Sequence, residues 1–250
     1  MKIKKILVSQ PEPENGKSPY NDLAKKNNLK IDFRPFIHIE SIHAKEFRKT
    51  RIDISDYTAI IFTSRTAIVH FFRICEEMRV TISDSMKYFC TSESTAYYLQ
   101  KYIVYRKRKI FFGKSRLIDL MEVINKHKDE KYFVPVSDSH KKDISKVLDN
   151  NNIKYTKAIL YRTVCSDLSD LSNVNYDVLV FYSPSGIKSL FENFPDFKQT
   201  NTKIASFGPT TKKAARDAGL RLDIEAPSPN APSMTMALEQ YIEDYNKKNN

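Results

Sequence analysis

The chain has 250 residues, of which 41% are hydrophobic, and its 41 Lys and Arg against 30 Asp and Glu leave a formal net charge of +11. That hydrophobic content can fill a core, which argues against a disordered chain, and the excess of cations favours anionic partners such as phosphates, polycarboxylates or nucleic acid. The three cysteines lie far apart and no histidine pair has metal-ligand spacing, so we expect neither a disulfide framework nor a metal.

The first apolar run, 6–8, is too short to be the core of a signal peptide. No other segment approaches the length of a membrane span. We therefore expect a cytoplasmic protein that does not bind a membrane, and we expect it to be a monomer.

Short apolar runs rich in β-branched residues predict the strands. In chain order they cover 5–9, 60–62, 88–90, 110–112, 132–136, 179–181, 204–207 and 222–225. Stretches between them have helical periodicity, and the continuously apolar runs 60–62 and 179–181 are typical of strands covered on both faces. Strands alternating with helices predict an α/β fold with doubly wound parallel sheets.

Segments 29–39 and 153–164 break this rhythm, because polar and apolar residues roughly alternate in them. Such alternation is typical of extended chain with one exposed side, so we expect a pair of strands that cross between two lobes. The predicted domains are a discontinuous lobe of 1–34 and 166–250, an inserted lobe of 42–152, and linker strands 35–41 and 153–165. A single larger sheet with an excursion is the alternative.

Alignment of the chain with itself indicates an internal duplication that makes the two lobes similar. Residues 57–72 align without a gap on 176–191, 87–95 align on 203–211, and 115–120 align on 233–238. Because the three matches occur in the same order at nearly constant offset, each lobe is predicted to repeat one pattern of strand, tight turn and helix.

Hydroxyl-rich turns follow four of these strands, at 63–66, 92–95, 183–186 and 208–211. Free backbone N–H groups, the positive end of a helix dipole and short hydroxyl side chains together form a receptor for oxyanions. Any one Ser or Thr could equally be an ordinary N-cap. Because the set recurs at strand carboxyl ends in both lobes, we expect an anionic small molecule in the cleft between them.

The glycines do not form a nucleotide-binding signature. Neither GxGxxG nor a Walker loop is present, which disfavours dinucleotide cofactors and nucleotide hydrolysis. Ser183 lies in a turn that superficially looks like a nucleophile elbow, but the GxSxG frame is missing and no histidine base lies nearby in the sequence. We expect no cofactor and no serine hydrolase.

Taken together, these motifs resemble the uroporphyrinogen-III synthase family over essentially the whole chain. The shared motifs are Phe-Thr-Ser at 62–64, the Thr-Ala of a Gly-x-x-Thr-Ala pattern at 95–96, Tyr-x-Thr at 161–163, Phe-x-Ser-Pro-Ser-Gly at 181–186 and Gly-Pro-Thr-Thr at 208–211. The resemblance implies two α/β lobes joined by a two-stranded ladder, one lobe being discontinuous.

The resemblance also implies a reaction. The family cyclises hydroxymethylbilane, a linear tetrapyrrole with eight carboxylates, to uroporphyrinogen III, with loss of water and inversion of the last pyrrole ring (ring D). No cofactor takes part. The chain would then be a lyase of heme biosynthesis. Its cleft would fold the substrate so that closure with inversion of ring D is faster than simple head-to-tail closure.

Candidate site residues follow from the motifs. Tyr161 would stand nearest the departing hydroxyl, as proton donor or orienting hydrogen bond, although it could also simply pack in the connecting strands. The turns and their amides would bind acetate and propionate groups. The residues concerned are Thr63, Ser64, Ser92, Ser94, Thr95, Ser183, Pro184, Ser185, Gly186, Gly208, Thr210 and Thr211.

Some positions depart from the family pattern. The family often has Thr-Arg after the first strand, where this chain has Ser9 and Gln10, and Lys17 is the candidate substitute for the missing guanidinium. Ser92 stands at the family's Gly, and Ser137 and Asp138 stand at its Arg-Gly. Two other functions remain open. One is a non-catalytic binder of tetrapyrroles or polyanions on the same fold. The other is a nucleic-acid binder, which the pI near 9.4 favours but no recognition motif supports.

Overall fold

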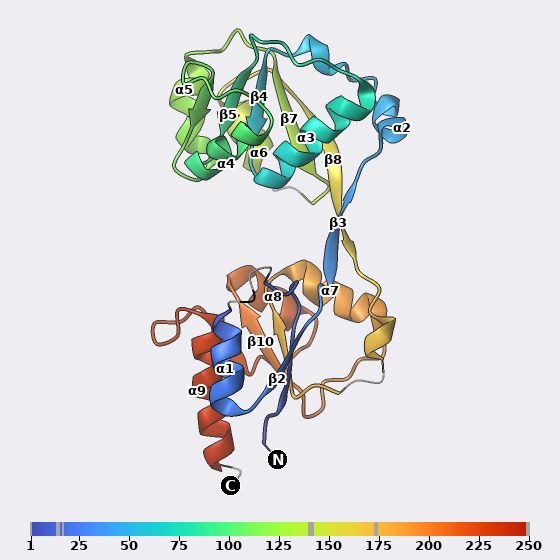
Figure 1. Ribbon diagram of the computed structural model, residues 1–250, viewed down its shortest axis with the longest axis vertical. Helices are drawn as coiled ribbons and strands as arrows, with labels where there is room; N and C mark the ends of the chain where they lie inside the picture. Colours follow the sequence, from blue (N-terminus) through green and yellow to red (C-terminus); the bar gives the residue numbers. More distant parts are fainter. Residues whose placement is uncertain (1, 14–15, 17, 140–142, 173–174, 249–250) are drawn as a thin grey trace. The chain divides into compact units, whose positions relative to one another are not determined.

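The computed structural model describes residues 2–13, 16, 18–139, 143–172 and 175–248, and the chain divides into two compact units. Unit 1 consists of Met1–His38 and Val164–Asn250, and unit 2 is Ile39–Thr163. Each unit is an α/β body in which helices cover both faces of a sheet (Figure 1). Because the strands fall into two sheets, the single-sheet alternative is wrong and the α/β prediction is confirmed.

Unit 1 has a five-stranded sheet of order β11-β10-β9-β1-β2 in which every neighbouring pair is parallel. One face packs against α1 and α9 and the other against α7 and α8, as the two apolar clusters of this unit show. The strands are β1 (Lys5–Val8), β2 (Lys30–Phe33), β9 (Val178–Phe181), β10 (Lys203–Phe207) and β11 (Ile224–Ala226). The helices are α1 (Pro19–Asn27), α7 (Pro184–Asn193), α8 (Pro209–Asp217) and α9 (Met234–Lys248).

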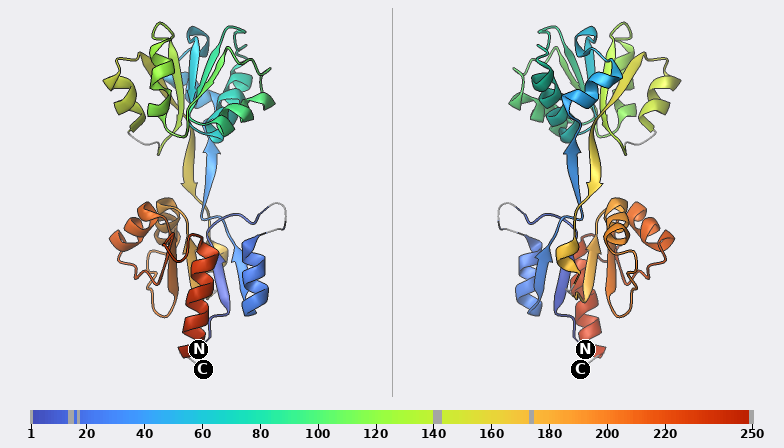
Figure 2. Two further views of the ribbon diagram at one scale, coloured as in Figure 1. Left: turned by 90° about the vertical axis from the view of Figure 1, so that its left-hand side faces the viewer. Right: turned by 90° about the vertical axis from the view of Figure 1, so that its right-hand side faces the viewer.

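Unit 2 is built on a six-stranded sheet of order β3-β8-β7-β4-β5-β6, which Figure 2 shows between its helices from two sides. Ile60 and Phe62 face a core shared with α2, α3 and α4, while Ala59 and Ile61 face one shared with α5 and α6. The strands are β3 (Ile37–Ser41), β4 (Ala59–Phe62), β5 (Lys87–Cys90), β6 (Ile110–Phe112), β7 (Tyr132–Ser137) and β8 (Tyr155–Cys165). The helices are α2 (Ala44–Phe47), α3 (Arg65–Met78), α4 (Glu93–Tyr98), α5 (Met121–Asn125) and α6 (Asp143–Asn150).

Short 3-10 turns complete the description of both units. They cover Arg48–Thr50, Ile54–Asp56, Leu99–Lys101, Leu117–Leu120 and Ser169–Leu171. The Leu117–Leu120 turn runs directly into α5, so the two together form one helical segment after β6.

The two sheets have the same spatial arrangement, which supports the internal duplication seen in the sequence. The aligned segments place β4 and β5 on β9 and β10, and with the strands that follow them in the chain, β6 and β11, they form triplets of consecutive neighbours in their sheets. Even the register agrees: Ala59 pairs with Lys87, and their counterparts Val178 and Lys203 also pair. The remaining strands differ in connection, because β7 and β8 follow their triplet whereas β1 and β2 precede theirs.

Two expectations about the connecting strands need correction. Segment 29–39 is not one strand, because it divides into β2 and β3 at Pro35, which has no N–H to donate, and at Phe36, whose side chain is buried in the core of unit 1. The expected linker 153–165 is mostly a strand of the second sheet. Residues of β8 from Tyr155 onward pair in parallel with β7, and Ala158 and Leu160 enter the core of unit 2.

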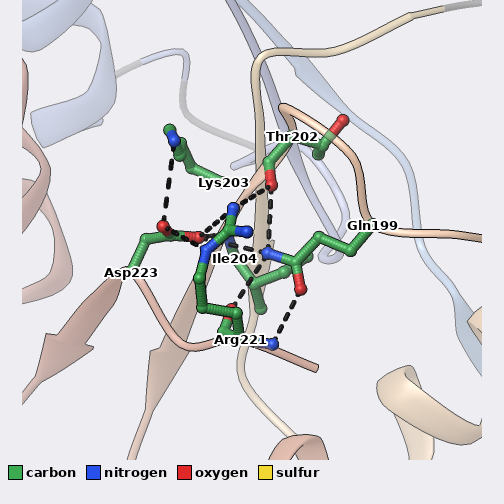
Figure 3. A network of polar contacts seen from close by, with 6 residues as sticks. All are labelled: Gln199, Thr202, Lys203, Ile204, Arg221 and Asp223. Carbon is green, nitrogen blue, oxygen red and sulfur yellow. Dashed lines mark hydrogen bonds and ion pairs between the residues drawn. The ribbon is translucent and has the colours of Figure 1, made fainter. Parts of the chain in front are cut away.

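A polar network ties the start of β10 to the loop before β11 in unit 1 (Figure 3). The Asp223 carboxylate is 9% exposed and accepts hydrogen bonds from the Ile204 N–H at 3.0 Å, Gln199 Nε2 at 3.1 Å and Arg221 Nε at 2.9 Å. Gln199 in turn accepts from the Arg221 N–H at 2.8 Å and donates to the Thr202 carbonyl at 3.0 Å. One carboxylate therefore satisfies donors from three segments.

We expect Asp223→Ala to lower the free energy of unfolding by about 2–3 kcal/mol, because it leaves several donors without their acceptor in a largely buried place. Urea unfolding followed by circular dichroism measures this. Asp217→Ala is the matched control, since Asp217 is exposed and pairs with Lys213 one turn earlier on α8, where about 0.5 kcal/mol or less is expected. Equal losses for the two variants would contradict the prediction.

Candidate functional site

A cavity of about 630 Å³ opens in unit 2 at the carboxyl ends of β4 and β7. From β4 the chain continues to β5 and β6 on one side and then returns to β7 on the other, so the strand order reverses between β4 and β7. Such a switch point leaves a crevice at the strand ends in doubly wound sheets, and ligands bind there. The cavity is lined by Thr63, Ser64, Thr91, Ser115, Arg116, Leu117, Ile118, Val136, Ser137, Ser139, Asp143, Ile144, Val147 and Tyr161.

Ser64 begins α3 at the edge of this cavity. Its backbone is extended (φ −159°, ψ 162°), and its Oγ accepts a hydrogen bond from the Ala67 N–H at 3.0 Å, so it is an N-cap. The neighbouring Thr63 is half-buried and also lines the cavity. The positive end of a 14-residue helix therefore lies at the cavity, where it favours negative charge.

Tyr161 reaches the same cavity from β8. Its side chain is 8% exposed, and its Oη lies 3.3 Å from Ser64 Oγ. Its ring stacks on His70 of α3, with centroids 4.8 Å apart and planes 18° apart. The structure therefore brings Tyr161 together with Thr63 and Ser64 of the predicted set.

A β-irregularity explains why Tyr161 points inward. Along β8, Leu160 is buried and Ile159 is exposed, so strict alternation would place residue 161 on the exposed side. The register shifts between Val136 and Ser137 of β7, so that Ile159 pairs with Val136 and Tyr161 with Ser137. The shift turns two consecutive side chains, Leu160 and Tyr161, towards the core, and such irregularities often re-aim a side chain next to a functional site.

Among the described residues that line the cavity, Arg116 is the one with a cationic side chain, and it was not among the residues predicted from the sequence. It follows β6, and its side chain is 76% exposed. The Asp119 carboxylate accepts hydrogen bonds from the backbone N–H groups of Ser115 and Arg116, and the bond from Arg116 is the main cause of the lowered pKa of Asp119. The self-alignment of 115–120 with 233–238 pointed to this turn, but its residues were not recognised as site candidates.

In the predicted turn after β5, the hydroxyl side chains lie within hydrogen-bonding distance of one another. Ser92 is the N-cap of α4, and its Oγ lies 2.9 Å from the buried Thr95 Oγ1 and 3.2 Å from Ser94 Oγ. None of these three residues lines the cavity, although the preceding Thr91 does. The N-cap interpretation accounts for this turn.

The predicted turns of unit 1 follow the neighbouring strands β9 and β10. Ser183 is the N-cap of α7, with its Oγ accepting from the Gly186 N–H at 3.1 Å, and Pro184 and Ser185 form the first turn of that helix. Gly208 stands before α8 with φ +85°, a conformation that favours glycine, and no side chain caps this helix. Thr211 is buried, whereas Thr210 is exposed.

Further polar groups lie around these turns. Tyr182, which precedes Ser183, has its Oη 2.6 Å from that of Tyr20, and burial is the main cause that raises the pKa of both phenols. The hydroxyl turn after β9 lies beside Ser9, which follows β1. A Cβ atom placed on Gly186 of this turn would be 3.6 Å from Ser9 Oγ. Lys17, the proposed substitute for the missing arginine, lies outside the described residues.

The described parts of the chain contain neither a candidate membrane span nor a metal-binding cluster. No helix there combines the length and apolar character needed to cross a bilayer. Within the same residues, no three His, Cys, Asp or Glu side chains gather as they would around a metal ion.

The fold and the cavity define an α/β protein with a cavity at the carboxyl ends of the parallel strands β4 and β7, beside the N-terminus of α3. The family model of uroporphyrinogen-III synthase HemD matches residues 18–236, and the chain belongs to this family. The prediction made from the sequence motifs is thereby confirmed.

Individual relatives agree with this assignment. A stretch of 114 residues is 30% identical to the uroporphyrinogen-III synthase of Saccharomyces cerevisiae and covers 39% of this chain and 41% of the yeast protein, so the match spans less than half of that relative. Among solved structures, uroporphyrinogen-III synthetase from Helicobacter pylori superposes with a TM-score of 0.61 at 17% identity, covering 96% of this chain and 99% of that one. A mutant uroporphyrinogen III synthase from Thermus thermophilus gives 0.57 at 13% identity, covering 96% and 99%. At these identities the structures show the fold alone.

Proposed function

We propose that the chain is a uroporphyrinogen-III synthase that cyclises hydroxymethylbilane to uroporphyrinogen III, with loss of water and inversion of ring D. The observation that carries this proposal is the pairing of Tyr161 with the α3 N-cap Ser64 inside the unit 2 cavity, at 3.3 Å. Family membership supports the reaction class, and the phenol and helix N-terminus at the cavity support the proposed roles.

In this proposal Tyr161 serves the loss of the hydroxyl group. Ser64 Oγ already accepts the Ala67 N–H, so its own hydrogen can be donated to Tyr161 Oη. The phenol hydrogen of Tyr161 is then available to the departing substrate hydroxyl, which takes up a proton and leaves as water.

Carboxylate binding is the second requirement. Arg116 offers a guanidinium to a substrate carboxylate, and Thr63 with the amides at the start of α3 offers uncharged donors. The same chemistry makes the turns 183–186 and 208–211 of unit 1 carboxylate receptors in this proposal, with their backbone N–H groups counting for more than Thr210 or Thr211. We also propose that Ser92, Ser94 and Thr95 act mainly by ending β5 and starting α4.

The remaining expectations stay proposals of the same kind. The protein would be a cytoplasmic monomer, it would need no cofactor, and its partner would be the linear tetrapyrrole rather than nucleic acid or a membrane. A non-catalytic binder of tetrapyrroles on this fold is the alternative, and it would bind the linear substrate without cyclising it.

A coupled assay separates these two functions. Hydroxymethylbilane is generated by its own synthase in the presence of the full chain, the products are oxidised, and isomers I and III are separated by chromatography. We expect predominantly isomer III, whereas hydroxymethylbilane alone closes to isomer I. Isomer I alone from demonstrably folded protein would overturn the proposal and favour the binder.

A further inference from the structure

Helix α3 contacts Tyr161 at two separated points. Ser64, at its N-cap, lies 3.3 Å from the phenol oxygen, and His70, almost two turns later, stacks on the phenol ring. The centroid distance of 4.8 Å and the angle of 18° describe nearly parallel rings in contact. One helix therefore touches both the reactive end and the face of this side chain.

His70 is itself held in place. It is 8% exposed, and its Nδ1 lies 3.2 Å from Ser41 Oγ of β3. Burial, and secondly the positive charge of Arg73, lower the pKa of its imidazole, so the ring is neutral near pH 7. A neutral ring can stack on a phenol without bringing an unpaired charge into the core.

The contact with His70 matters because Tyr161 lies at an irregular point of β8. At the register shift of β8 its side chain leaves the regular alternation and follows Leu160 into the core side. Without a flat neighbour, the ring could rotate about its χ angles, and the phenol oxygen would move relative to Ser64 and the cavity.

We infer that His70 is a positioning residue: together with Ser64 it forms an α3 clamp that holds the Tyr161 phenol in its reactive orientation. The α3 clamp rests on the proposed function, because it gives Tyr161 its geometry for proton donation. Its contribution is to orientation, so it affects kcat more than KM, since small misplacements of a catalytic group are costly in rate.

The test compares His70→Leu, which removes the flat ring, with His70→Phe, which keeps a ring and removes both nitrogens. In the coupled isomer assay we expect His70→Leu to lower kcat for isomer III by about tenfold with KM changed by less than about twofold. His70→Phe should keep kcat within about threefold of the wild type. In a Tyr161→Phe background, His70→Leu should lower kcat by less than about twofold, because the hydroxyl to be positioned is already gone.

His127→Leu is the matched control. His127 packs on the rings of Phe89 and Phe111, in the same unit and outside the cavity, so its loss should leave kcat unchanged. Circular dichroism and thermal unfolding verify that each variant is folded. If His70→Phe is as slow as His70→Leu, or if His70→Leu costs the same with and without the Tyr161 hydroxyl, the α3 clamp is wrong.

A readout without turnover keeps the inference separate from the proposed function. With ring-labelled tyrosine, the ring protons of Tyr161 feel the ring current of His70, so their NMR signals should shift in His70→Leu and stay close to the wild type in His70→Phe. Wild-type protein that forms no isomer III but shows this pattern would refute the synthase function while retaining the clamp geometry. Signals that do not respond to His70→Leu would refute the clamp itself.

Discussion

Tyr161→Phe is expected to lower kcat for isomer III by about a hundredfold, because it removes one oxygen at the point where the leaving hydroxyl must be protonated. General acid catalysis contributes about 10²–10⁴-fold in rate, and we place the effect at the lower end of that range. Phenylalanine keeps the ring that stacks on His70, so folding should be little affected. The fraction of isomer III in the product should fall with kcat, because unassisted closure then competes.

The measurement is the coupled isomer assay on both proteins at the same concentration. Tyr155→Phe is a matched control, since Tyr155 lies in the same strand β8 and does not line the cavity. A Tyr161→Phe enzyme with more than about a third of the wild-type kcat would show that the hydroxyl only helps to order the ring. A loss of the same size in Tyr155→Phe would point to a structural effect along β8.

Arg116→Ala should raise KM for hydroxymethylbilane by about ten- to a hundredfold and leave kcat nearly unchanged. A hydrogen bond to a charged partner is worth about 1.5–3 kcal/mol, and binding that is equal in ground and transition state appears in KM. Because the Arg116 side chain is 76% exposed, screening by salt should bring the effect towards tenfold at physiological ionic strength.

Two variants sharpen this second test. Arg116→Lys keeps the charge but loses the planar pair of donors, so an intermediate KM is expected. Arg108→Ala removes the same charge from an exposed position that does not line the cavity, and it should change KM by less than about twofold. If Arg108→Ala and Arg116→Ala raise KM equally, the contribution is general charge attraction rather than a carboxylate contact.

Much of the fold could be predicted from residue types and their spacing along short stretches of the chain. The continuously apolar runs at 60–62 and 179–181 are strands whose residues are buried, as double coverage requires. Ser64, Ser92 and Ser183 each cap a helix through the amide three residues later, which depends on nearest neighbours alone. The self-alignment predicted similar lobes, and the shared strand order and register of the two sheets agree with it.

The arrangement of the site was harder to predict because it depends on contacts between distant parts of the chain. The alternating pattern of 153–164 was interpreted as a crossing strand, and its parallel pairing with β7 could not be read from that pattern. Arg116 follows the edge strand β6. Its local sequence does not indicate that β4 and β7 are neighbours in the sheet, or that the cavity at their carboxyl ends includes Arg116. The clustering of hydroxyl turns was visible, but which of them line a cavity was not.

By itself, the sequence determined the class of fold, the duplication, the helix starts and the family, because each depends on residue types, their spacing or a self-match. Only the tertiary structure decided that Tyr161 turns inward beside Ser64 and His70, and that Arg116 belongs to the cavity while Ser94 and Thr95 do not. The physical reason is that strand order and register are set by the packing of whole sheets, and a one-residue shift between β7 and β8 changes which side chain faces the core.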